Sequence, residues 1–499
     1  MRALGAAGAL LAGVAAYDIA QRRRPILRNF PIVGHLRYLL EAFGPELRQY
    51  IVTGNDDERP FSRNQRRWIA ALADREDPHF GFGSDLDWSR QPGHVLVAQA
   101  EFPHPGRPGG EPRDAPLPAA RVLGGANRRR HAFRPASAVN VSGMSYGALG
   151  AHAVEAMNRG AALAGCLHNT GEGGISDHHA HGGELVLQIG TAYFGCRDAA
   201  GRFSLAALRE LVDRHPVRAI EVKLSQGAKP GVGARLPAAK VTPAIARARG
   251  VPAWRDCESP PAHTAFDDAD GLVAFVEEIA DATGLPVGIK SAVGEPGFWL
   301  ELGRAMARDA AGPDFITVDG GEGGTGAGPL AFTDHVALPF RSALARVHGA
   351  LADAGALDRT VLVGSGMLGL PANALLAFAM GCDMVNVGRE AMLAVGCIQA
   401  QRCHTGRCPS GVTTHSPWLQ RGLDPAIAAE RLANYVTGLR AELARLARTC
   451  GVPHPALVTP DRIELLDGAR TSPASEVYAI REPRRLADDD RRALAAAMA

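Results

Sequence analysis

Lysine is almost absent from this sequence: four of its 54 basic residues are lysines, and all four lie within 68 residues of one another. Arginine can replace lysine wherever only a positive charge is needed, so the remaining lysines mark positions that require a compact ammonium group. Lys223, Lys229 and Lys290 follow predicted strands, whereas Lys240 is equally typical of a solvated surface position. The first three are therefore candidate functional residues.

An excess of charge of one sign is also missing. The 54 basic residues face 52 acidic ones, which leaves a formal net charge of +2 on 499 residues and excludes nucleic acid as the main partner. Cysteine is scarce as well, and eight cysteines in so long a chain exclude a disulfide scaffold. Disorder of the whole chain is excluded because 46% of the residues are hydrophobic, enough to bury a large core.

Long apolar runs are lacking too, apart from one stretch at the N-terminus. Ala3 to Tyr17 carries no charge, but fifteen residues are short for a membrane span, and extension to Ala20 includes Asp18. Residues 1–24 are therefore expected to be a hydrophobic leader that is either a marginal membrane anchor or a buried helix. The arginines at 22–24 would keep the following chain on the cytoplasmic side, which predicts a cytoplasmic protein whose residues 3–20 can contact the inner face of the membrane.

Strand-like and helix-like segments alternate through the middle of the chain. Each apolar or β-branched run ends in a glycine-rich or polar loop and is followed by a helical pattern. Eight such units over about 250 residues predict an α/β fold, a (β/α)8 barrel rather than an open sheet. The expected strands are 139–144, 166–169, 185–189, 219–224, 286–291, 315–318, 361–363 and 383–387, and the expected helices include 148–164, 205–214, 271–283, 297–311 and 371–380.

The segments outside this pattern complete the predicted organisation. Residues 25–132 form an N-terminal helical and irregular segment, in which 102–132, rich in proline, glycine and arginine, is expected to be an arm or surface loop. The barrel is expected to cover 133–424, and residues 425–499, rich in alanine, arginine and leucine, to form C-terminal helices outside it.

Functional groups of such a barrel lie where its strands end. Lys223 and Lys290 each end a predicted strand, and Lys229 follows in the loop after Lys223. A cation there can stabilise negative charge on a reduced flavin, although it could instead pair with a structural carboxylate such as Glu172 or Glu221. Other polar groups expected at the same rim are Ser142, Met144, Asn169, Gln188 and Gln226.

Glycine-rich loops follow the last three predicted strands. Backbone N–H groups after strands seven and eight of this fold form a recurrent phosphate site, and an arginine there can add a charge-assisted contact. Tight turns also need glycine, so the position of these residues matters more than their number. The residues in question are Gly320, Gly321, Gly364, Gly366, Gly388 and Arg389.

Three of the eight cysteines lie close together. Cys397, Cys403 and Cys408 are spaced C-x5-C-x4-C in a loop covering 396–411. This is not the spacing of a zinc finger, although His404 could serve as a fourth zinc ligand. Three thiolates without a fourth are typical of an iron–sulfur cluster in which one iron of the cubane is missing. The spacing therefore favours such a cluster over a zinc site and over unligated thiols.

These motifs together resemble the FMN-binding domain of the glutamate synthase family, in a stand-alone form, over roughly residues 139–414. The matching segments are SGMSYGALG (142–150), NTGEGG (169–174), VKLSQGAKPGVGARLPAAKV (222–241), DGGEGGTGAGP (319–329) and GCIQAQRCHTGRCPSGVTTH (396–415). The resemblance implies a (β/α)8 barrel that carries FMN and a [3Fe-4S] cluster and reduces 2-iminoglutarate, formed from 2-oxoglutarate and ammonia, to L-glutamate.

The resemblance also assigns roles to residues. It implies that Cys397, Cys403 and Cys408 bind the cluster. Lys223, Gln226 and Lys290 would face the flavin ring. Glu172 and Lys229 would address the substrate carboxylates and the transfer of a proton.

Departures from the family pattern leave the donors open. The sequence contains neither the glutaminase nor the β-helix domain of full glutamate synthases, so the amine is expected to be free ammonia, ammonia from a separate glutaminase subunit, or methylamine as in N-methylglutamate synthases. No dinucleotide fingerprint is present, which predicts electrons from a ferredoxin-like or flavoprotein partner. Two further alternatives are an FMN-dependent 2-hydroxy-acid oxidase with a base among His178, His179 and His181, and a non-catalytic, membrane-tethered electron-transfer subunit.

Overall fold

The computed structural model describes residues 2–21, 25–79, 81–84, 86–88, 91–106, 113–480 and 486–498. The chain divides into two compact units, residues 1–66 and 67–499. Residues 67–132 and 425–499 fall in the same unit as the barrel residues 133–424, and the domain boundaries at 132/133 and 424/425 stay predictions.

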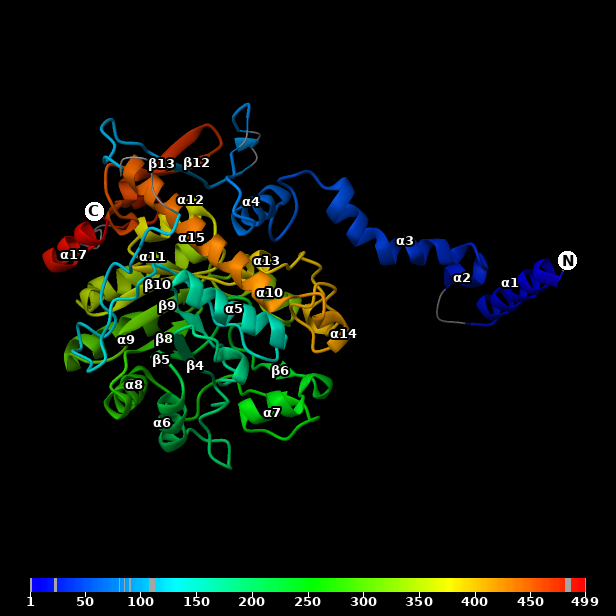
Figure 1. Ribbon diagram of the computed structural model, residues 1–499, viewed down its shortest axis with the longest axis horizontal. Coiled ribbons are helices and arrows are strands. Elements are labelled where there is room, and N and C mark those ends of the chain that lie inside the picture. The colour runs from blue at the N-terminus through cyan, green and yellow to red at the C-terminus, as the bar shows by residue number, and fades with distance from the viewer. Residues whose placement is uncertain are drawn as a thin grey trace. The chain divides into compact units, whose positions relative to one another are not determined.

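The core of the second unit is a closed barrel of eight parallel strands, which confirms the predicted (β/α)8 architecture (Figure 1). Seven of the eight strands follow the predicted segments to within two residues at either end, and the first ends earlier than expected, at Val141. In barrel order the strands are β2 (Val139–Val141), β3 (His168–Asn169), β4 (Leu185–Ile189), β5 (Val217–Lys223), β8 (Val287–Ser291), β9 (Phe315–Asp319), β10 (Val361–Ser365) and β11 (Met384–Val387).

Helices surround the strands, and side-chain caps fix where several of them begin. The Ser204 hydroxyl accepts from the amide of Ala207, and the Asp268 carboxylate accepts from the amide of Gly271, at the starts of α6 and α8. Helices of this ring are α5 (Ala151–Ala164), α6 (Leu205–Arg214), α8 (Ala269–Thr283), α9 (Pro296–Asp309), α11 (Phe340–Asp353), α12 (Pro371–Ala379) and α13 (Arg389–Ala394). A small insertion between β5 and β8 holds β6 (Arg235–Leu236), α7 (Pro243–Arg249) and β7 (Cys257–Glu258).

Side chains inside the barrel change from apolar to polar along the strands. Alternate residues of a strand share one face, so Ala219, Glu221 and Lys223 of β5 all face inward. The level near the strand starts is apolar and forms one buried cluster with Ala119 and Leu123: Leu167, Val186, Ala219, Phe315, Val361, Val363 and Met384. Toward the carboxyl ends of the strands the inward-facing side chains are polar, such as Glu221, and then cationic, such as Lys223. The groups capable of chemistry therefore lie at the carboxyl ends of the strands.

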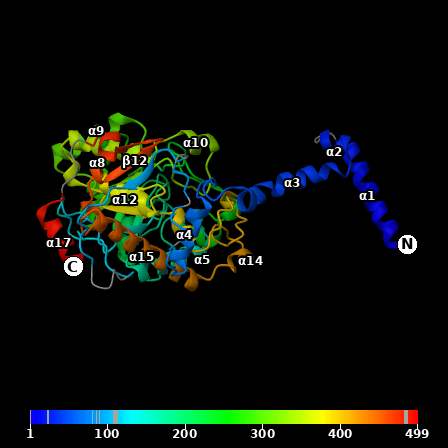
Figure 2. The ribbon, with the colours of Figure 1, turned by 90° about the horizontal axis from the view of Figure 1, so that it is seen from above.

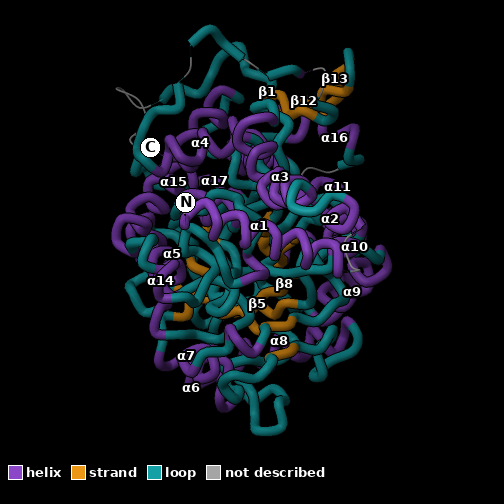
Figure 3. Tube along the Cα trace, turned by 90° about the vertical axis from the view of Figure 1, so that its right-hand side faces the viewer, coloured by secondary structure: helices purple, strands orange, loops and turns teal. Residues whose placement is uncertain are grey.

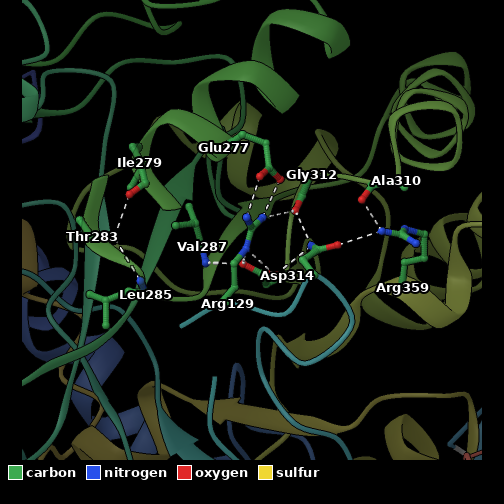
Figure 4. Close-up of polar contacts among 11 residues, drawn as sticks. Arg129, Glu277, Ile279, Thr283, Leu285, Val287, Ala310, Gly312, Asp314 and Arg359 are labelled. Carbon is green, nitrogen blue, oxygen red and sulfur yellow. Dashed lines mark hydrogen bonds and ion pairs between the residues drawn. The ribbon is translucent and has the colours of Figure 1, made fainter. Parts of the chain in front are cut away.

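The segment before the barrel corrects one prediction. Residues 113–132 were expected to lie in an arm or surface loop, but Leu117, Ala119 and Leu123 are buried and cover the start of the barrel. Polar composition misled the prediction because the Arg129 guanidinium is itself enclosed. Its nitrogens contact Glu277 at 2.6 Å and Asp314 at 2.9 Å (Figure 4).

The C-terminal part is not helical throughout, which is a second correction. Helix α15 (Pro425–Thr449) lies along α5, as predicted for a helix outside the barrel (Figure 2). It is followed by β12 (Ile463–Asp467) and β13 (Arg470–Pro473), which join β1 (His94–Val97) in an antiparallel sheet away from the barrel strands (Figure 3). In β12 the buried Ile463 and Leu465 alternate with partly buried residues, but strands of four or five residues contain too few repeats of this alternation to be distinguished from helical segments. Helices α14 (Pro417–Gln420), α16 (Ala474–Val477) and α17 (Asp488–Met498) complete this part.

The first unit is helical and holds the apolar leader. Its helices are α1 (Arg2–Ala20), α2 (Pro25–Asn29) and α3 (Gly34–Leu47), followed by a π-helical turn at Arg48–Val52, and α4 (Arg63–Ala73) begins at its end. Within the described residues, no helix has the length and apolar character needed to cross a membrane, so the spanning anchor considered above is not found. Leu10, Leu11 and Tyr17 are exposed, so α1 is not buried within its own unit. Residues 22–24 lie outside the described part.

Candidate functional site

Lys223 is held in an ion pair at the end of β5. Its ammonium nitrogen lies 2.9 Å from Glu172 Oε1 and donates to Gln226 Oε1 at 2.6 Å. Glu172 comes from the loop after β3, and a Cβ at Gly190 would lie 2.5 Å from Glu172 Oε2, so the absence of a side chain at 190 makes room for the carboxylate. The predicted residues Glu172, Lys223 and Gln226 therefore meet at one point of the rim.

Opposing effects set the charge of this pair. Burial raises the pKa of Glu172, but the Lys223 ammonium, assisted by Lys229 and Arg249, outweighs it and holds the pKa below its ordinary value. Burial lowers the pKa of Lys229, and Glu172 opposes this only in part. The carboxylate is thus ionised at neutral pH next to two cationic groups.

A pocket opens beside these groups. Lys229 reaches it from the loop after β5, together with Thr191 and the backbone around Gly231 and Gly233. The pocket is therefore lined by two ammonium groups and one carboxylate, which suits a small anionic molecule that exchanges a proton.

Lys290 lies at the end of β8, next to Lys223 in the strand register. Its ammonium is 3.5 Å from Asp319 Oδ2, and the same carboxylate oxygen accepts from the amide of Gly227 at 2.9 Å. Burial lowers the pKa of Lys290, but Asp319 and Glu221 outweigh burial and raise it. Lys290 is therefore a permanent cation of the rim, whereas the pKa of Lys229 is displaced downward.

Glu221 belongs to the site, although no sequence motif marks it as a functional residue. It is buried beneath Lys223 and accepts from Asn169 Nδ2 at 2.8 Å, Gln188 Nε2 at 2.6 Å and Thr317 Oγ1 at 2.7 Å. The side-chain nitrogens of Asn169 and Gln188 both donate to Glu221. The side-chain oxygen of Asn169 therefore faces the other way and accepts from the backbone amide of Gly171. Strand parity could have identified Glu221, because residue 221 shares the inward face with residue 223.

The remaining polar residues after β2 lie at the same rim. Ser142 is buried, and its amide donates to the carbonyl of Val387 on the neighbouring strand. Met144 lies in the following loop and is partly exposed. Both predicted positions therefore border the polar level formed by Asn169 and Gln188.

The glycine-rich loops after β9, β10 and β11 come together. The Gly320 amide donates to the carbonyl of Ser365 at 2.9 Å, and Gly366 has a φ of 123°, which side chains other than hydrogen rarely tolerate. A Cβ at Gly324 would lie 2.6 Å from Cδ of Arg389, so the absence of a side chain at 324 leaves room for the side chain of Arg389.

Several predicted residues of these loops have other partners in the structure. The Gly321 amide donates to the carbonyl of Leu338, and the Arg389 guanidinium donates to the carbonyl of Glu322. Gly388 is the N-cap of α13. Gly364 lies within β10, not in a loop, where a Cβ would face Leu368 and Phe340.

The cysteine loop follows α13. Cys397 and Cys403 are partly exposed and Cys408 is buried. Burial raises the pKa of Cys408, but hydrogen bonds from Ser410 and Thr413 outweigh it and lower the pKa, which favours the thiolate. Within the described residues, no three His, Cys, Asp or Glu side chains are grouped as ligands of a single metal ion.

Lys240 contacts this loop. Its ammonium donates to the carbonyl oxygen of Cys403 at 3.0 Å, so the solvated bystander considered above is partly buried against the cysteines. The segment after β5 thus carries Lys229 to the pocket and Lys240 to the cysteine loop, and it connects the two regions.

Comparison with known sequences assigns the family. The family described as the conserved region in glutamate synthase matches residues 124–453, two thirds of the chain. A glutamate synthase large subunit-like protein of Bacillus subtilis, YerD, is 36% identical over 481 residues, covering 89% of this chain and 90% of its own length. The chain belongs to the glutamate synthase family. The predicted resemblance is confirmed.

More distant glutamate synthases match a shorter part. The archaeal glutamate synthase [NADPH] of Methanocaldococcus jannaschii is 33% identical over 317 residues, which cover 63% of this chain and 59% of the relative. Among solved structures, a mandelate oxidase aligns with a TM-score of 0.41 and 18% identity, covering 75% of this chain and 87% of that one. That likeness is too low to carry an inference about function.

The histidines considered for a hydroxy-acid oxidase lie elsewhere in this member of the glutamate synthase family. His178 contacts the ring of Tyr146, and His179 is buried against His168. Neither they nor His181 are among the residues lining the pocket. A different histidine, His263, lies beside the site, where its Nε2 is 2.9 Å from the carbonyl oxygen of Lys223. No motif in the sequence marked it.

Proposed function

We propose that this chain is an FMN-dependent oxidoreductase that reduces 2-iminoglutarate, formed from 2-oxoglutarate and ammonia, to L-glutamate. The observation that carries the proposal is the pocket at which Lys223, Lys229 and Glu172 meet. Family membership supports it, since the archaeal and B. subtilis relatives are named as glutamate synthase or as its large subunit-like protein.

The glycine-rich loops at the rim and Arg389 have the donor groups that the phosphate of a flavin would need. A Cβ at Gly320 would meet the side chains of Glu322 and Phe340, and a Cβ at Gly366 would meet the backbone of Gly320, so glycine lets these loops pack closely at the strand ends, where Arg389 adds a cation. Residues that would hold the ring are Ser142, Met144, Asn169, Gln188, Lys223, Gln226 and Lys290, and residues that would hold the phosphate are Gly320, Gly321, Gly364, Gly366, Gly388 and Arg389. When bound, FMN supplies the hydride that reduces the C=N bond.

The chain itself must supply the proton and the orientation. Reduction of an imine adds a hydride to carbon and a proton to nitrogen, so a proton-carrying group has to lie within hydrogen-bond reach of the substrate nitrogen. Glu172 is hydrogen-bonded to Lys223 at 2.9 Å, which allows the pair to relay a proton between solvent and substrate. Lys229, whose pKa is lowered, lies on the same pocket wall.

Charge complementarity favours a dicarboxylate substrate. A five-carbon 2-oxo acid carries two carboxylates, and the pocket offers the ammonium groups of Lys229 and Lys223. The carboxylate of Glu172 neutralises part of the Lys223 charge, so Lys229 is the stronger candidate for binding a substrate carboxylate.

We further propose that Cys397, Cys403 and Cys408 hold a [3Fe-4S] cluster that passes electrons to the flavin. Three thiols in twelve residues, one of them with a lowered pKa, fit such a cluster in donor chemistry. Lys240 supports the loop at Cys403 and places a positive charge beside the ligands. The electron donor is proposed to be ferredoxin-like or a flavoprotein. The archaeal relatives carry NADPH in their names, but this chain spans only 59% of the first of them.

Replacing Cys403 by serine is expected to remove the cluster and leave the flavin bound, because two thiolates cannot retain a three-iron cluster. Iron and acid-labile sulfide per chain should fall from about three and four to below one, while the flavin absorbance stays the same. Cys450→Ser, at a buried cysteine outside the loop, is the matched control and should keep the cluster. Unchanged iron in Cys403→Ser would contradict the ligand assignment.

The activity is tested by anaerobic reoxidation of the reduced flavin. Purified protein is expected to release FMN on acid extraction, and 2-oxoglutarate with ammonia should reoxidise the dithionite-reduced protein and yield glutamate. Methylamine in place of ammonia tests the N-methylglutamate synthase alternative. The oxidase alternative predicts instead that 2-hydroxyglutarate reduces the oxidised flavin. Absence of reoxidation with either amine, in protein that contains FMN, would contradict the glutamate-forming activity while leaving the cofactor proposal in place.

A further inference from the structure

The first unit carries many large apolar side chains that are not buried within it. Fourteen large apolar side chains between Leu10 and Val52 are exposed, out of 25 such side chains found in the described residues. We call these fourteen the leader surface. They are Leu10, Leu11, Tyr17, Ile19, Phe30, Ile32, Val33, Leu36, Leu39, Leu40, Phe43, Leu47, Ile51 and Val52. So many exposed apolar side chains within some forty residues mark a site of interaction with a membrane or a protein.

Helix α3 carries part of the leader surface as one stripe. Leu36, Leu39, Leu40, Phe43 and Leu47 recur at intervals of three and four residues, so they share one face of the helix. Each of these side chains is between 45% and 57% exposed. Helix α1 differs, because no residue from Ala3 to Tyr17 is charged and the helix is apolar all round.

The one carboxylate of α1 is removed from this surface. Asp18 is fully buried, accepts from the amide of Ile32 at 2.9 Å, and lies 2.9 Å from Nε2 of His35. The contact joins α1 to the turn before α3 and to α3 itself. Burying this charge leaves the exposed part of α1 without a group that an anionic surface would repel.

The charge of this region departs from the balance of the whole chain. The first 52 residues contain seven arginines and three acidic residues, whereas the complete chain has 54 basic and 52 acidic residues. Arginine near an apolar helix favours the headgroups of anionic lipids over zwitterionic ones. The leader surface therefore combines apolar side chains with an excess of positive charge.

We propose that the leader surface binds the surface of an anionic membrane, with α1 and α3 lying in the plane of the interface. No described helix can span a bilayer, so the apolar side chains would enter only the boundary between headgroups and acyl chains. A second copy of the chain is the less suitable occupant, because a twofold interface would place the two arginine-rich segments against each other.

Vesicle flotation of the full-length protein tests the proposal. Vesicles of phosphatidylcholine with about 30% phosphatidylglycerol are expected to bind the protein at least tenfold more tightly than vesicles of phosphatidylcholine alone, and added salt should weaken the difference. Equal binding to both compositions would overturn the anionic specificity, and binding to neither would overturn the membrane proposal.

Two sets of variants separate the apolar and the charged contributions. Leu40→Asp with Phe43→Asp should reduce binding to the anionic vesicles at least tenfold. Arg28→Gln with Arg37→Gln and Arg48→Gln, at exposed arginines of the same unit, should reduce it by about two orders of magnitude, since each arginine near the surface contributes about fivefold. Leu163→Asp with Ile427→Asp, at exposed apolar positions of the second unit, is the matched control and should bind like the parent protein.

The oligomeric state of the same variants tests the competing occupant. Light scattering without lipid is expected to give the same mass for the parent and for the Leu40→Asp, Phe43→Asp variant. A parent dimer that this variant converts to a monomer, together with absence of vesicle binding, would assign the leader surface to a second copy and overturn the proposal. Retained far-UV circular dichroism shows that the variant is folded.

Discussion

Replacement of Arg129 by alanine is expected to lower the free energy of unfolding by about 3–5 kcal/mol, the usual result of removing one partner of a buried ion pair. The side chain of Arg129 is 7% exposed and that of Asp314 is 1% exposed. Without the guanidinium, the Asp314 carboxylate would stay buried with only Asn127 and the Val287 amide to compensate its charge (Figure 4). Urea unfolding followed by circular dichroism measures the change.

The neighbouring arginine supplies a matched control. Arg130 is exposed and donates to the Thr283 carbonyl at 3.3 Å, so Arg130→Ala should change the free energy of unfolding by less than about 0.5 kcal/mol. Arg129 lies where the barrel strands begin, at the end opposite to Lys223 and Glu172. The folded Arg129→Ala protein is therefore expected to keep its flavin content. An equal effect of both substitutions would show that the enclosed ion pair contributes little.

Replacement of Glu172 by glutamine is expected to lower kcat by about 10²–10⁴-fold, the range typical of losing a general acid–base group. Glutamine has the size of glutamate and can still accept a hydrogen bond from Lys223, but it cannot relay a proton. Lys223 holds Glu172 ionised, so the resting carboxylate passes on a proton that it first accepts from its partner. Protonation of Glu172 as the pH falls through its lowered pKa would weaken the ion pair with Lys223, and the parent enzyme should lose activity there. That limb of the pH profile should be absent in the variant.

Lys229→Ala distinguishes binding from proton transfer in the same pocket. Loss of a charge-assisted contact worth about 1.5–3 kcal/mol should raise KM for 2-oxoglutarate by about 10–100-fold and spare FMN. Glu155→Gln, on a helix outside the barrel, controls for removal of a carboxylate and should resemble the parent. A Glu172→Gln enzyme with parent kcat would exclude the carboxylate from the reaction. A Lys229→Ala enzyme with parent KM would exclude Lys229 from substrate binding.

The sequence alone determined the barrel and its family. Parallel strands buried on both faces must read as short apolar runs between helices, and this pattern placed β4 and α6 at their exact bounds. The scarcity of lysine identified Lys223, Lys229 and Lys290, because an ammonium kept in an arginine-rich chain reflects a local requirement. Spacing likewise grouped the three cysteines before any geometry was known.

Tertiary structure alone decided which groups face one another. The role of Glu221 depends on Asn169, Gln188 and Thr317, which come from three other strands and meet only when the barrel closes. The arginine-rich segment around Arg129 was predicted to be a surface loop because composition cannot show that Arg129 forms ion pairs with Glu277 and Asp314, which are distant in the sequence. The leader was ambiguous for the same reason. Local sequence fixes that a helix is apolar, whereas its exposure depends on whether the rest of the chain provides a surface to bury it.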